Sequence, residues 1–573
     1  MKKIYITLLM TIPLMLFSQG ENDNWYFGGF AGINFSGSTP IALHDSQMFV
    51  AGAATASVSD SSGKLLFYTD GDNVWNREHQ LMDNGDNLNQ YSSWQICIVK
   101  HPANPNLYYI FGSGTPVSGI GNVIRYSVVD ISQGSIGQNG LPLGSVLPNF
   151  KTVPILNDSG EFTSSKGATI VPHANGNAFW VLFTEDRTLY SYLLDSTGLV
   201  NNSPVISNLN IGNINPSFFT HHSYLKASPR LSNCSAFSNY LSFTSVGNNS
   251  YNESRVYSFD DSTGKITNDY ELVIATLNPF LTEFNSTSSI LYMGGYEPGV
   301  GALYAINLEA STNNNIVYSS VYPINHTSIP YTAVEGMQRN KDGDIYIQYG
   351  YNYSASKILN PDVYGGATLD LYNIYLHPGV GRSFPQLVPS LSASTGAHCI
   401  PDKILQNPEQ NMNHTYQVAN TITAKDNYKI DAGKNITMKA GNNITLLPGV
   451  DIQSGARYLG TIEGCETPCG AAERKNKSEK KSMFLDLRKK NSSKTGIEVK
   501  DTSVTIYPNP ASDILNIKTQ AKINEVEVYD KSGKKINVPV NNDKVNVKNL
   551  PAGSYLIRII TEKDTVSKQF IKK

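Results

Sequence analysis

Cysteine and charge are both scarce in this sequence. Five cysteines among 573 residues are too few for disulfides to be the main source of stability in so long a chain. Charged residues make up 16% of the chain, where about a quarter is usual. The 45 basic and 47 acidic residues nearly cancel, to a net charge of -2, which excludes a general attraction to nucleic acid or anionic membranes. Any ligand must therefore be recognised by a local site.

Long apolar runs and sustained helical periodicity are also missing. The one marked apolar run, residues 4–17, follows Lys2 and Lys3 and breaks at Ser18. It is shorter than the ~20 residues that cross a bilayer, so it is typical of a cleaved signal peptide, residues 1–19, rather than of a membrane anchor. We expect no transmembrane segment elsewhere and no nucleic-acid partner. The lack of helical periodicity predicts all-β domains.

Tyrosine and turn-forming residues are abundant instead. Between residues 22 and 403, short tyrosine-rich apolar runs alternate with turns of Gly, Asn, Asp and Ser. One kind of run ends in a polar or glycine turn and recurs at residues 65–71, 107–112, 179–184, 241–245, 291–295 and 345–350. A second kind ends in Asp or Asn and recurs at residues 123–130, 189–195, 256–260 and 303–307.

The spacing of these runs, about 40 to 70 residues, accommodates roughly four strands and favours propeller blades over a sandwich. We predict a β-propeller over residues 22–403, with seven blades; six and eight are the alternatives. Residues 25–35 are expected to supply a strand that closes the ring with the C-terminal end. In the turns that begin at Asp60, Asp195 and Asp261, the aspartate should accept hydrogen bonds from its own turn.

Residues 414–465 are the most regular part of the chain. Apolar residues fall eight apart in two columns, and small corner residues repeat at the same interval. The two columns consist of Ile422, Ile430, Met438 and Leu446, and of Tyr428, Ile436, Ile444 and Ile452. This pattern predicts a short β-solenoid-like stack with an eight-residue period. Two hairpins with coincidental alternation are the alternative.

Residues 466–500 are polar and basic, with too little apolar content for a core, and are predicted to be a flexible linker. Just before and within it, Cys465 and Cys469 are close enough for a local disulfide, while a zinc site would need two further ligands. Cys97, within an apolar run, is expected to be a buried strand residue.

Residues 501–573 contain about seven short strand-like runs, which predict a small Ig-like β-sandwich. This segment resembles the type A sorting domain of the type IX secretion system of Bacteroidetes. The matching residues are Tyr507, Pro508, Asn509, Pro510, Gly533, Lys534, Gly553, Tyr555, Lys572 and Lys573. The resemblance implies the type IX translocon and its sortase as partners. It also implies an extracellular or outer-membrane-surface location, after export to the periplasm, with release or attachment to surface lipopolysaccharide.

The N-terminal region resembles the propeller-like domain of uncharacterised Bacteroidetes surface proteins, some of them linked to gliding motility. The matching segments are residues 25–28, 54–60, 63–71, 74–76, 82–85, 108–111, 224–229 and 281–285. This resemblance implies a fold and no activity. The regular stack likewise resembles a module found just upstream of such sorting domains.

Two turns are rich in oxygen ligands. Asp70 and Asp72 lie in the first, and Asp83 and Asp86 lie in the second, so both are candidates for Ca²⁺. They lack the spacing of an EF-hand, and turn formation is the simpler explanation. No other cofactor is expected.

Three side chains are candidates to face a ligand: Trp75, His221 and His222. Trp75, with Trp94 and the many tyrosines, could form a stacking platform for sugars, although aromatics between blades are usually core. The two histidines precede a predicted strand, and a plain surface pair is the alternative. No nucleophile motif, phosphate loop or metalloprotease helix is present, so no catalytic residue is predicted.

These observations predict a non-catalytic surface protein that binds glycan or protein ligands in adhesion. One alternative is an extracellular hydrolase or lyase with its site in the propeller channel, which paired acids about 5 to 10 Å apart would favour. Another is a gliding-motility component of the same architecture.

Overall fold

The computed structural model describes residues 20–50, 54–91, 93–116, 122–163, 165, 167–185, 187–211, 223–231, 237–245, 252–276, 279–297, 300–309, 318–320, 334–350, 352–376, 383–391, 400–409, 413–463, 481–487, 505–508, 511–519, 522–529, 535–551, 553–561 and 565–573. The chain divides into two compact units, Met1–Arg488 and Lys489–Lys573. The predicted signal peptide lies outside the described residues.

Strands make up nearly all the regular structure of the described residues, apart from two 3-10 turns, η1 (Gly20–Asn22) and η2 (Pro148–Phe150). This confirms the all-β prediction. Within the described ranges, no helix is long and apolar enough to cross a membrane.

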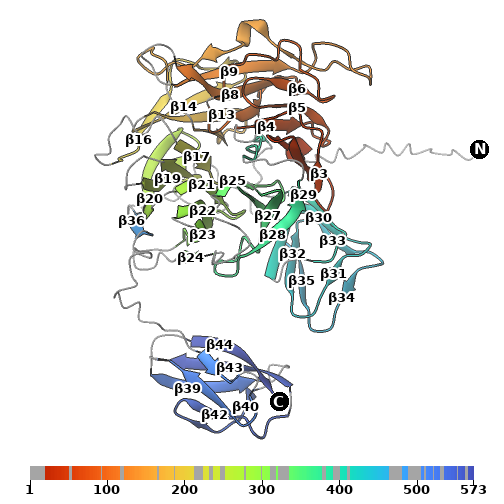
Figure 1. The fold of residues 1–573 in the computed structure, drawn as a ribbon, viewed down its shortest axis with the longest axis vertical. Coiled ribbons are helices and arrows are strands. Elements are labelled where there is room, and N and C mark those ends of the chain that lie inside the picture. The colour runs from red at the N-terminus through yellow and green to blue at the C-terminus, as the bar shows by residue number, and fades with distance from the viewer. Residues whose placement is uncertain are drawn as a thin grey trace, which may run out of the picture. The chain divides into compact units, whose positions relative to one another are not determined.

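Seven antiparallel sheets, here called blades 1 to 7, follow one another along the first unit (Figure 1). Blades 1 and 2 consist of β1 (Asn24–Phe27), β2 (Ala31–Asn34) and β3 (Ile41–Leu43), then β4 (Ala56–Ser59), β5 (Leu65–Thr69) and β6 (Val74–Asn76). Blade 3 consists of β7 (Cys97–Lys100), β8 (Leu107–Pro116), β9 (Asn122–Asp130), β10 (Ser145–Val146) and β11 (Val153–Pro154). Blade 4 consists of β12 (Ala168–Pro172), β13 (Phe179–Glu185), β14 (Thr188–Asp195), β15 (Gly198–Leu199) and β16 (Val205–Asn208).

The remaining blades have four consecutive strands each. Blade 5 consists of β17 (Ser223–Ala227), β18 (Asn239–Ser245), β19 (Asn252–Asp260) and β20 (Lys265–Thr276). Blade 6 consists of β21 (Pro279–Phe284), β22 (Ile290–Glu297), β23 (Val300–Asn307) and β24 (Tyr318–Ser320). Blade 7 consists of β25 (Val334–Arg339), β26 (Ile345–Tyr349), β27 (Ser354–Leu359) and β28 (Thr368–Tyr375).

The blades are arranged as a propeller. From blade 1 to blade 7, the first strand of each blade contacts the first strand of the next, and β28 of blade 7 contacts β3 of blade 1. The six recurring runs predicted from the sequence are the second strands of blades 2 to 7. The propeller and its seven blades are therefore confirmed by the sheet topology.

Each boundary between neighbouring blades holds a hydrophobic cluster of described residues. The second strands are buried on both faces, as in β13, because they contribute side chains to the clusters on either side. The cluster between blades 1 and 2 is the smallest, with Tyr26, Met48 and Tyr68 as its buried members. This boundary therefore depends on a few aromatic side chains.

The ring closes differently from the prediction. Residues 24–43 do not lend a strand to the last blade; they form blade 1 by themselves. Closure comes from packing: the ring of Trp25 lies 4.7 Å from that of Phe35, 6.1 Å from that of Tyr346 on blade 7 and 5.3 Å from that of Phe384. An aromatic cluster replaces the shared sheet.

The three predicted aspartate turns form, but in one of them a neighbouring aspartate accepts the hydrogen bonds. Asp60 and Asp195 accept backbone N–H groups of their own turns. In the third turn, Asp260 is the acceptor, whereas Asp261 forms an ion pair with Arg230 at 2.9 Å. The prediction for Asp261 was wrong by one residue.

A stack of parallel strands follows the propeller (Figure 1). Its strands are β29 (Ile400–Leu405), β30 (Asn413–Ala424), β31 (Lys429–Ile430), β32 (Asn435–Ala440), β33 (Asn443–Leu446), β34 (Asp451–Ile452) and β35 (Arg457–Ile462). Asn413 pairs with Asn435, and Asn435 pairs with Arg457, so one coil takes 22 residues. The solenoid-like stack is confirmed, but the eight-residue period is not its stacking repeat: eight residues carry the chain from one side of a coil to the next.

A charged cluster joins the stack to the propeller. Lys403 Nζ on β29 lies 3.2 Å from Asp342 Oδ1, and Lys341 Nζ lies 3.4 Å from the same oxygen. Burial raises the pKa of Asp342, but the two ammonium groups outweigh it and hold this pKa below its ordinary value. Burial lowers the pKa of Lys403, but the charges of Asp342, Asp344 and Glu409 and the hydrogen bond to Asp342 together outweigh it and place this pKa above its ordinary value.

Replacing Asp342 with asparagine should lower the free energy of unfolding by about 2 kcal/mol at neutral pH, given the partial exposure of the pair. A carboxylate whose pKa is lower in the folded protein than in the unfolded chain stabilises the fold when the pH is above its pKa in the unfolded chain, ordinarily 3.8. This stabilisation is lost as the pH falls through the pKa of the carboxylate in the folded protein. Urea unfolding of both proteins should therefore show a constant difference at about pH 5 to 7 that shrinks below about pH 4. A difference that stayed constant down to about pH 2 would contradict this interpretation.

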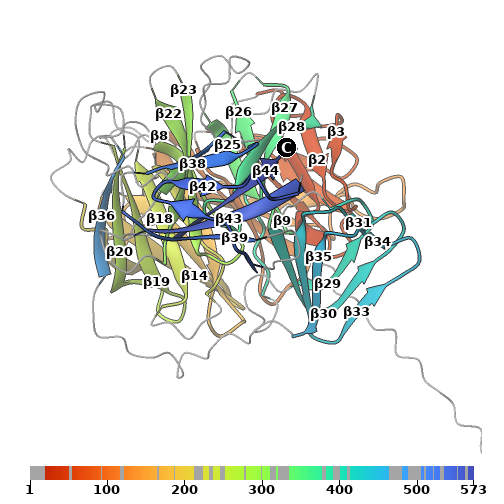
Figure 2. The same ribbon diagram turned by 90° about the horizontal axis from the view of Figure 1, so that it is seen from below.

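The segment predicted to be a flexible linker contains a further strand, β36 (Lys481–Asp486). It pairs with β20 of blade 5 in parallel orientation and lies along its outer side (Figure 2). The linker prediction is therefore wrong for residues 481–487. The rest of residues 466–500, with Cys469, and Cys465 before them lie outside the described residues.

The second unit is a sandwich of two four-stranded sheets, as predicted. One sheet consists of β37 (Thr505–Tyr507), β38 (Ile514–Lys518), β42 (Lys544–Asn546) and β41 (Val540–Asn541). The other consists of β40 (Lys535–Ile536), β39 (Ile523–Tyr529), β43 (Gly553–Thr561) and β44 (Thr565–Lys572). Its core includes Leu515, Val528, Ile557 and Phe570, all fully buried.

Candidate functional site

The inner strands of the propeller are crossed by residues 383–391, which follow blade 7. Gln386 Nε2 donates to the carbonyl of Ala168 on β12 at 2.8 Å. The backbone N–H of Val388 donates to Asn22 Oδ1 at 2.7 Å, and Asn22 Nδ2 donates back to the carbonyl of Val388 at 3.0 Å. This segment fills part of the centre of the propeller and ties η1, which precedes blade 1, and blade 4 to the end of the ring.

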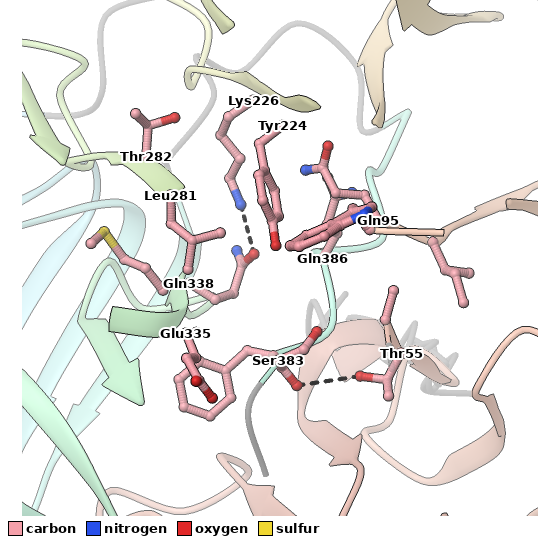
Figure 3. A pocket seen from close by; sticks show the side chains of 16 residues that line it. Thr55, Gln95, Tyr224, Lys226, Leu281, Thr282, Glu335, Gln338, Ser383 and Gln386 are labelled. Atoms are coloured by element: carbon pink, nitrogen blue, oxygen red, sulfur yellow. Dashed lines mark hydrogen bonds between the residues drawn. The ribbon is translucent and has the colours of Figure 1, made fainter. Parts of the chain in front are cut away.

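Beside this segment lies a small cavity of about 40 Å³ (Figure 3). It is lined by Trp94, Tyr224, Lys226, Glu335 and Gln386, among others. A cavity of this size holds a few water molecules, whereas ligand pockets usually measure about 300 to 1,000 Å³. Its walls are partly apolar and partly polar, with amide, hydroxyl and charged groups from blades 5 to 7.

A buried carboxylate lies between two cations beside the cavity. Glu283, fully buried on β21, lies 2.8 Å from Lys226 Nζ on β17 and 3.9 Å from Arg339 Nε on β25. Lys226 Nζ also donates to Gln338 Oε1 at 2.6 Å (Figure 3). Burial lowers the pKa of Arg339, and the charge of Glu283 opposes this shift. The three charged residues link blades 5, 6 and 7.

A pair of acids facing the channel would favour the hydrolase alternative. Of the residues that line this cavity, Glu335 is the one carboxylate. Glu283 is committed to Lys226 and Arg339.

A second group of polar and aromatic residues lies between blades 1 and 2. Tyr26 on β1 stacks on Tyr68 on β5 at 4.6 Å between ring centroids, and Tyr68 stacks on Trp75 on β6 at 5.5 Å. Tyr26 and Tyr68 are buried, while Trp75 is partly exposed. The stack therefore runs from the core to the surface and ends on an indole ring.

Hydrogen bonds hold this stack along its polar side. Tyr26 Oη donates to Asp45 Oδ1 at 2.9 Å, and His79 Nε2 lies 3.1 Å from Asp45 Oδ2. Tyr68 Oη accepts the backbone N–H of Gln47 at 3.1 Å and lies 3.2 Å from His79 Nδ1. The tautomer with a proton on Nε2 lets Tyr68 donate to Nδ1 and His79 donate to Asp45, so every polar group is paired.

Burial and charge shape this network. Burial raises the pKa of Tyr26, and the charge of Asp45 raises it further; burial also raises the pKa of Tyr68. Both phenols therefore stay neutral donors. The Asp45 side chain is 52% exposed and that of His79 is 23% exposed, so the network opens to solvent beside Trp75.

Of the three predicted ligand-facing residues, Trp75 belongs to this group, whereas His221 and His222 lie outside the described residues. Trp94 instead lines the central cavity, with its ring 5.5 Å from that of Tyr224. Sequence reasoning missed Asp45 and His79. No local motif marks them, because they meet only when blades 1 and 2 pack.

The four Ca²⁺ candidates already have protein partners. Asp70 accepts the backbone N–H groups of Asp72 and Asn73, and Asp72 accepts that of Asn89. Asp83 accepts hydrogen bonds from Ser135, and Asp86 forms an ion pair with Lys151 at 3.2 Å. Among the described residues, no group of three or more acids, histidines or cysteines could hold a metal ion.

Cys97 is buried on β7, as predicted, and burial raises the pKa of its thiol to about 12. Gln386 Nε2 lies 3.3 Å from its sulfur. Such a thiol is unreactive at neutral pH.

The sorting motif is spread over the second unit. Tyr507 ends β37 and is half exposed, followed by Pro508. Gly553 and Tyr555 lie on β43, where Tyr555 is buried, stacks on Phe570 and donates to the carbonyl of Pro551 at 2.8 Å. Lys572 is buried at the end of β44, and the backbone N–H of Lys573 donates to the carbonyl of Ala511 at 2.9 Å. Four residues of the motif lie outside the residues that the structure describes: Asn509, Pro510, Gly533 and Lys534.

Comparison with protein families identifies this unit. Residues 505–573 match the family described as the secretion system C-terminal sorting domain. The predicted sorting domain is thus confirmed. The protein is a client of the type IX secretion system, recognised by its machinery and exported to the cell surface or the extracellular space.

Comparison with solved structures finds low similarity. A candidate 6-phosphogluconolactonase from Bacteroides fragilis is 10% identical, with 63% of this chain and 98% of that chain covered and a TM-score of 0.34. The β-propeller domain of Cps50 (Swd1) from Myceliophteria thermophila is 12% identical, with 56% and 86% covered and a TM-score of 0.29. A comparison with curated proteins finds no match.

Proposed function

Because the chain carries a type IX sorting domain, we propose that the propeller is a non-catalytic binding module that works outside the cell in adhesion, with a saccharide ligand bound at Trp75. The sorting domain directs the export, and a sortase then removes it, leaving the propeller released or attached to surface lipopolysaccharide. Residues 1–19 act as the signal peptide for the first step into the periplasm.

The stack of Tyr26, Tyr68 and Trp75 is the observation that carries the proposal. An indole ring that is partly exposed, and braced from behind by two buried phenol rings, presents a rigid apolar face. The C–H face of a pyranose ring packs well on such a surface, because the indole ring is flat and apolar and is already held in place by the stack.

Polar groups suited to sugar hydroxyls lie beside this face. The exposed Asp45 carboxylate accepts hydrogen bonds, and the His79 imidazole is held in one orientation by Asp45 and Tyr68. Phe30, in the turn between β1 and β2, and Phe49, in the segment after β3, have exposed rings 5.7 Å apart and add apolar surface to blade 1. This combination of one aromatic platform and a few fixed polar groups is typical of ligand sites.

The small size of the cavity at the centre of the propeller favours a binding site on the surface over a catalytic site in the channel. Residues 383–391 occupy part of that space, and the cavity beside them has room for a few water molecules. The buried charges there serve as cross-links between blades.

Replacing Trp75 with alanine should weaken saccharide binding at least about tenfold, since it removes the stacking face. The test presents purified protein to an array of bacterial and algal polysaccharides and host glycans, and measures retention and product release. Tyr372→Ala is the matched control, because Tyr372 is an aromatic residue of blade 7 with 58% of its surface exposed.

Retention of one glycan class by the wild type and by Tyr372→Ala, with loss in Trp75→Ala, would support the proposal. Asp45→Asn should reduce the same binding without removing the stack. Equal retention by all variants would remove the site from consideration, and product release would replace the binding function with catalysis.

A further inference from the structure

A short segment just before the sorting domain is built into the propeller. Residues Lys481 to Asp486 form β36, which pairs in register with Tyr270 to Ala275 of β20. The backbone N–H of Leu487 continues the pairing, donating to the carbonyl of Ala275 at 2.9 Å. In Figure 2, β36 lies along β20 as the outermost strand of blade 5.

The side chains of this segment alternate between core and solvent. Met483, Leu485 and Leu487 are 3%, 9% and 4% exposed, whereas Phe484 is 49% exposed. The three buried side chains join the cluster between blades 5 and 6, which includes Leu272, Ile274 and Phe284, among others. This pattern is that of a strand docked on a hydrophobic face.

The surface that receives this segment has the properties of a peptide-binding edge. β20 is the last strand that blade 5 forms from its own consecutive residues, and it is long, Lys265–Thr276. Without β36 it would expose a row of backbone N–H and C=O groups next to an apolar cluster. A peptide added as an extra strand satisfies those groups, and its alternate side chains fill the cluster.

We propose that the outer edge of blade 5 is a peptide-docking site and that residues 481–487 are its ligand. The segment is a clasp that belongs to the propeller and not to the sorting domain. The chain therefore leaves the folded unit at the outer edge of blade 5. Separation of the sorting domain at any bond after residue 487 leaves the clasp in place, and the end of the chain is held at this edge.

The parallel orientation of β36 indicates that it is a docked segment and not a fifth strand of the blade itself. Every other pair of named strands described within the seven blades is antiparallel, whereas β36 runs parallel to β20. Parallel neighbours need a long connection, and here the partner strand arrives from more than 200 residues downstream. Blade 5 thus has its four antiparallel strands without β36, and β36 is an additional strand at its edge.

Hydrogen exchange on the full chain tests the proposal. In Leu485→Asp, the buried charge should undock the segment, and the amides of residues 270–276 and 481–487 should exchange at least tenfold faster. Phe484→Asp is the matched control, because it places the same charge on the exposed side of the same strand, and its exchange should equal that of the wild type.

Addition of a synthetic peptide of residues 479–488 should then restore the protection of residues 270–276 in Leu485→Asp, while the same peptide with Leu485→Asp should not. Leu485→Ala provides a milder variant if the aspartate unfolds blade 5 as a whole. Equal exchange in all variants, or no response to the peptide in an undocked variant, would overturn the proposal.

Discussion

Replacing Glu283 with glutamine should lower the free energy of unfolding by about 3 kcal/mol or more. The side chain is fully buried and faces Lys226 and Arg339, whose side chains are only 12% and 7% exposed. Removal of its charge leaves two cations with little access to water and no compensating carboxylate from this position. Urea unfolding followed by tryptophan fluorescence measures the change.

Glu161→Gln is the control for this substitution, because Glu161 is exposed and its change should stay within about 0.5 kcal/mol. If the two variants unfolded at the same urea concentration, the buried charges would not stabilise the packing of blades 5, 6 and 7. A double variant, Glu283→Gln with Lys226→Met, should recover part of the loss, since it removes one of the two cations that face Glu283.

Replacing Trp25 with alanine should cost about 3 to 5 kcal/mol. The side chain is 1% exposed and lies between Phe35, Phe384 and Tyr346 at the boundary where the ring closes. The cavity left behind would weaken the one boundary that joins the two ends of the propeller. Differential scanning calorimetry gives the loss, and hydrogen exchange should place it in blades 1 and 7.

Trp25→Phe distinguishes packing from polarity. Trp25 Nε1 is buried without a hydrogen-bond partner among the described residues, so phenylalanine removes no hydrogen bond and keeps much of the apolar volume. Its cost should stay below about 1.5 kcal/mol. A loss equal to that of the alanine variant would argue against the packing account.

The strands could be predicted from the sequence because their signals are local. An apolar run such as residues 179–184 and a turn such as that at Asp195 specify a strand and its end within ten residues. Repetition of the same pair of runs then indicated a propeller, and the sheets confirmed seven blades. Likewise, the sorting motif is a set of residue types at fixed positions, so the sorting domain could be identified from the sequence.

The errors concern partners far apart in the chain. The stack's residues fall eight apart along the sequence, but the neighbours that touch are 22 apart, since each coil has several sides. Met483, Leu485 and Leu487 are too few and too scattered among basic residues to reveal a strand without the edge of β20. Ring closure by Trp25 and Tyr346 has no local signal either.

The candidate site likewise combines a residue that could be predicted from the sequence with residues that could not. Trp75 could be selected by residue type alone, as an aromatic in a polar region. Asp45 and His79 could not, because a lone acid and a lone histidine in turns have many roles, and only the packing of blade 1 on blade 2 brings them together. For Asp70 and Asp83, turn and loop hydrogen bonds account for the oxygen-rich composition.

By itself, the sequence determined the all-β class, the repeated blades and the C-terminal sorting domain, since a periodicity or a motif within a short stretch of chain indicates each of them. Only the tertiary structure decided how the ring closes, which charges sit in its centre, where the clasp docks and what surrounds Trp75. These features depend on contacts between residues tens to hundreds of positions apart, whose energy comes from burial and from paired charges that no local pattern encodes.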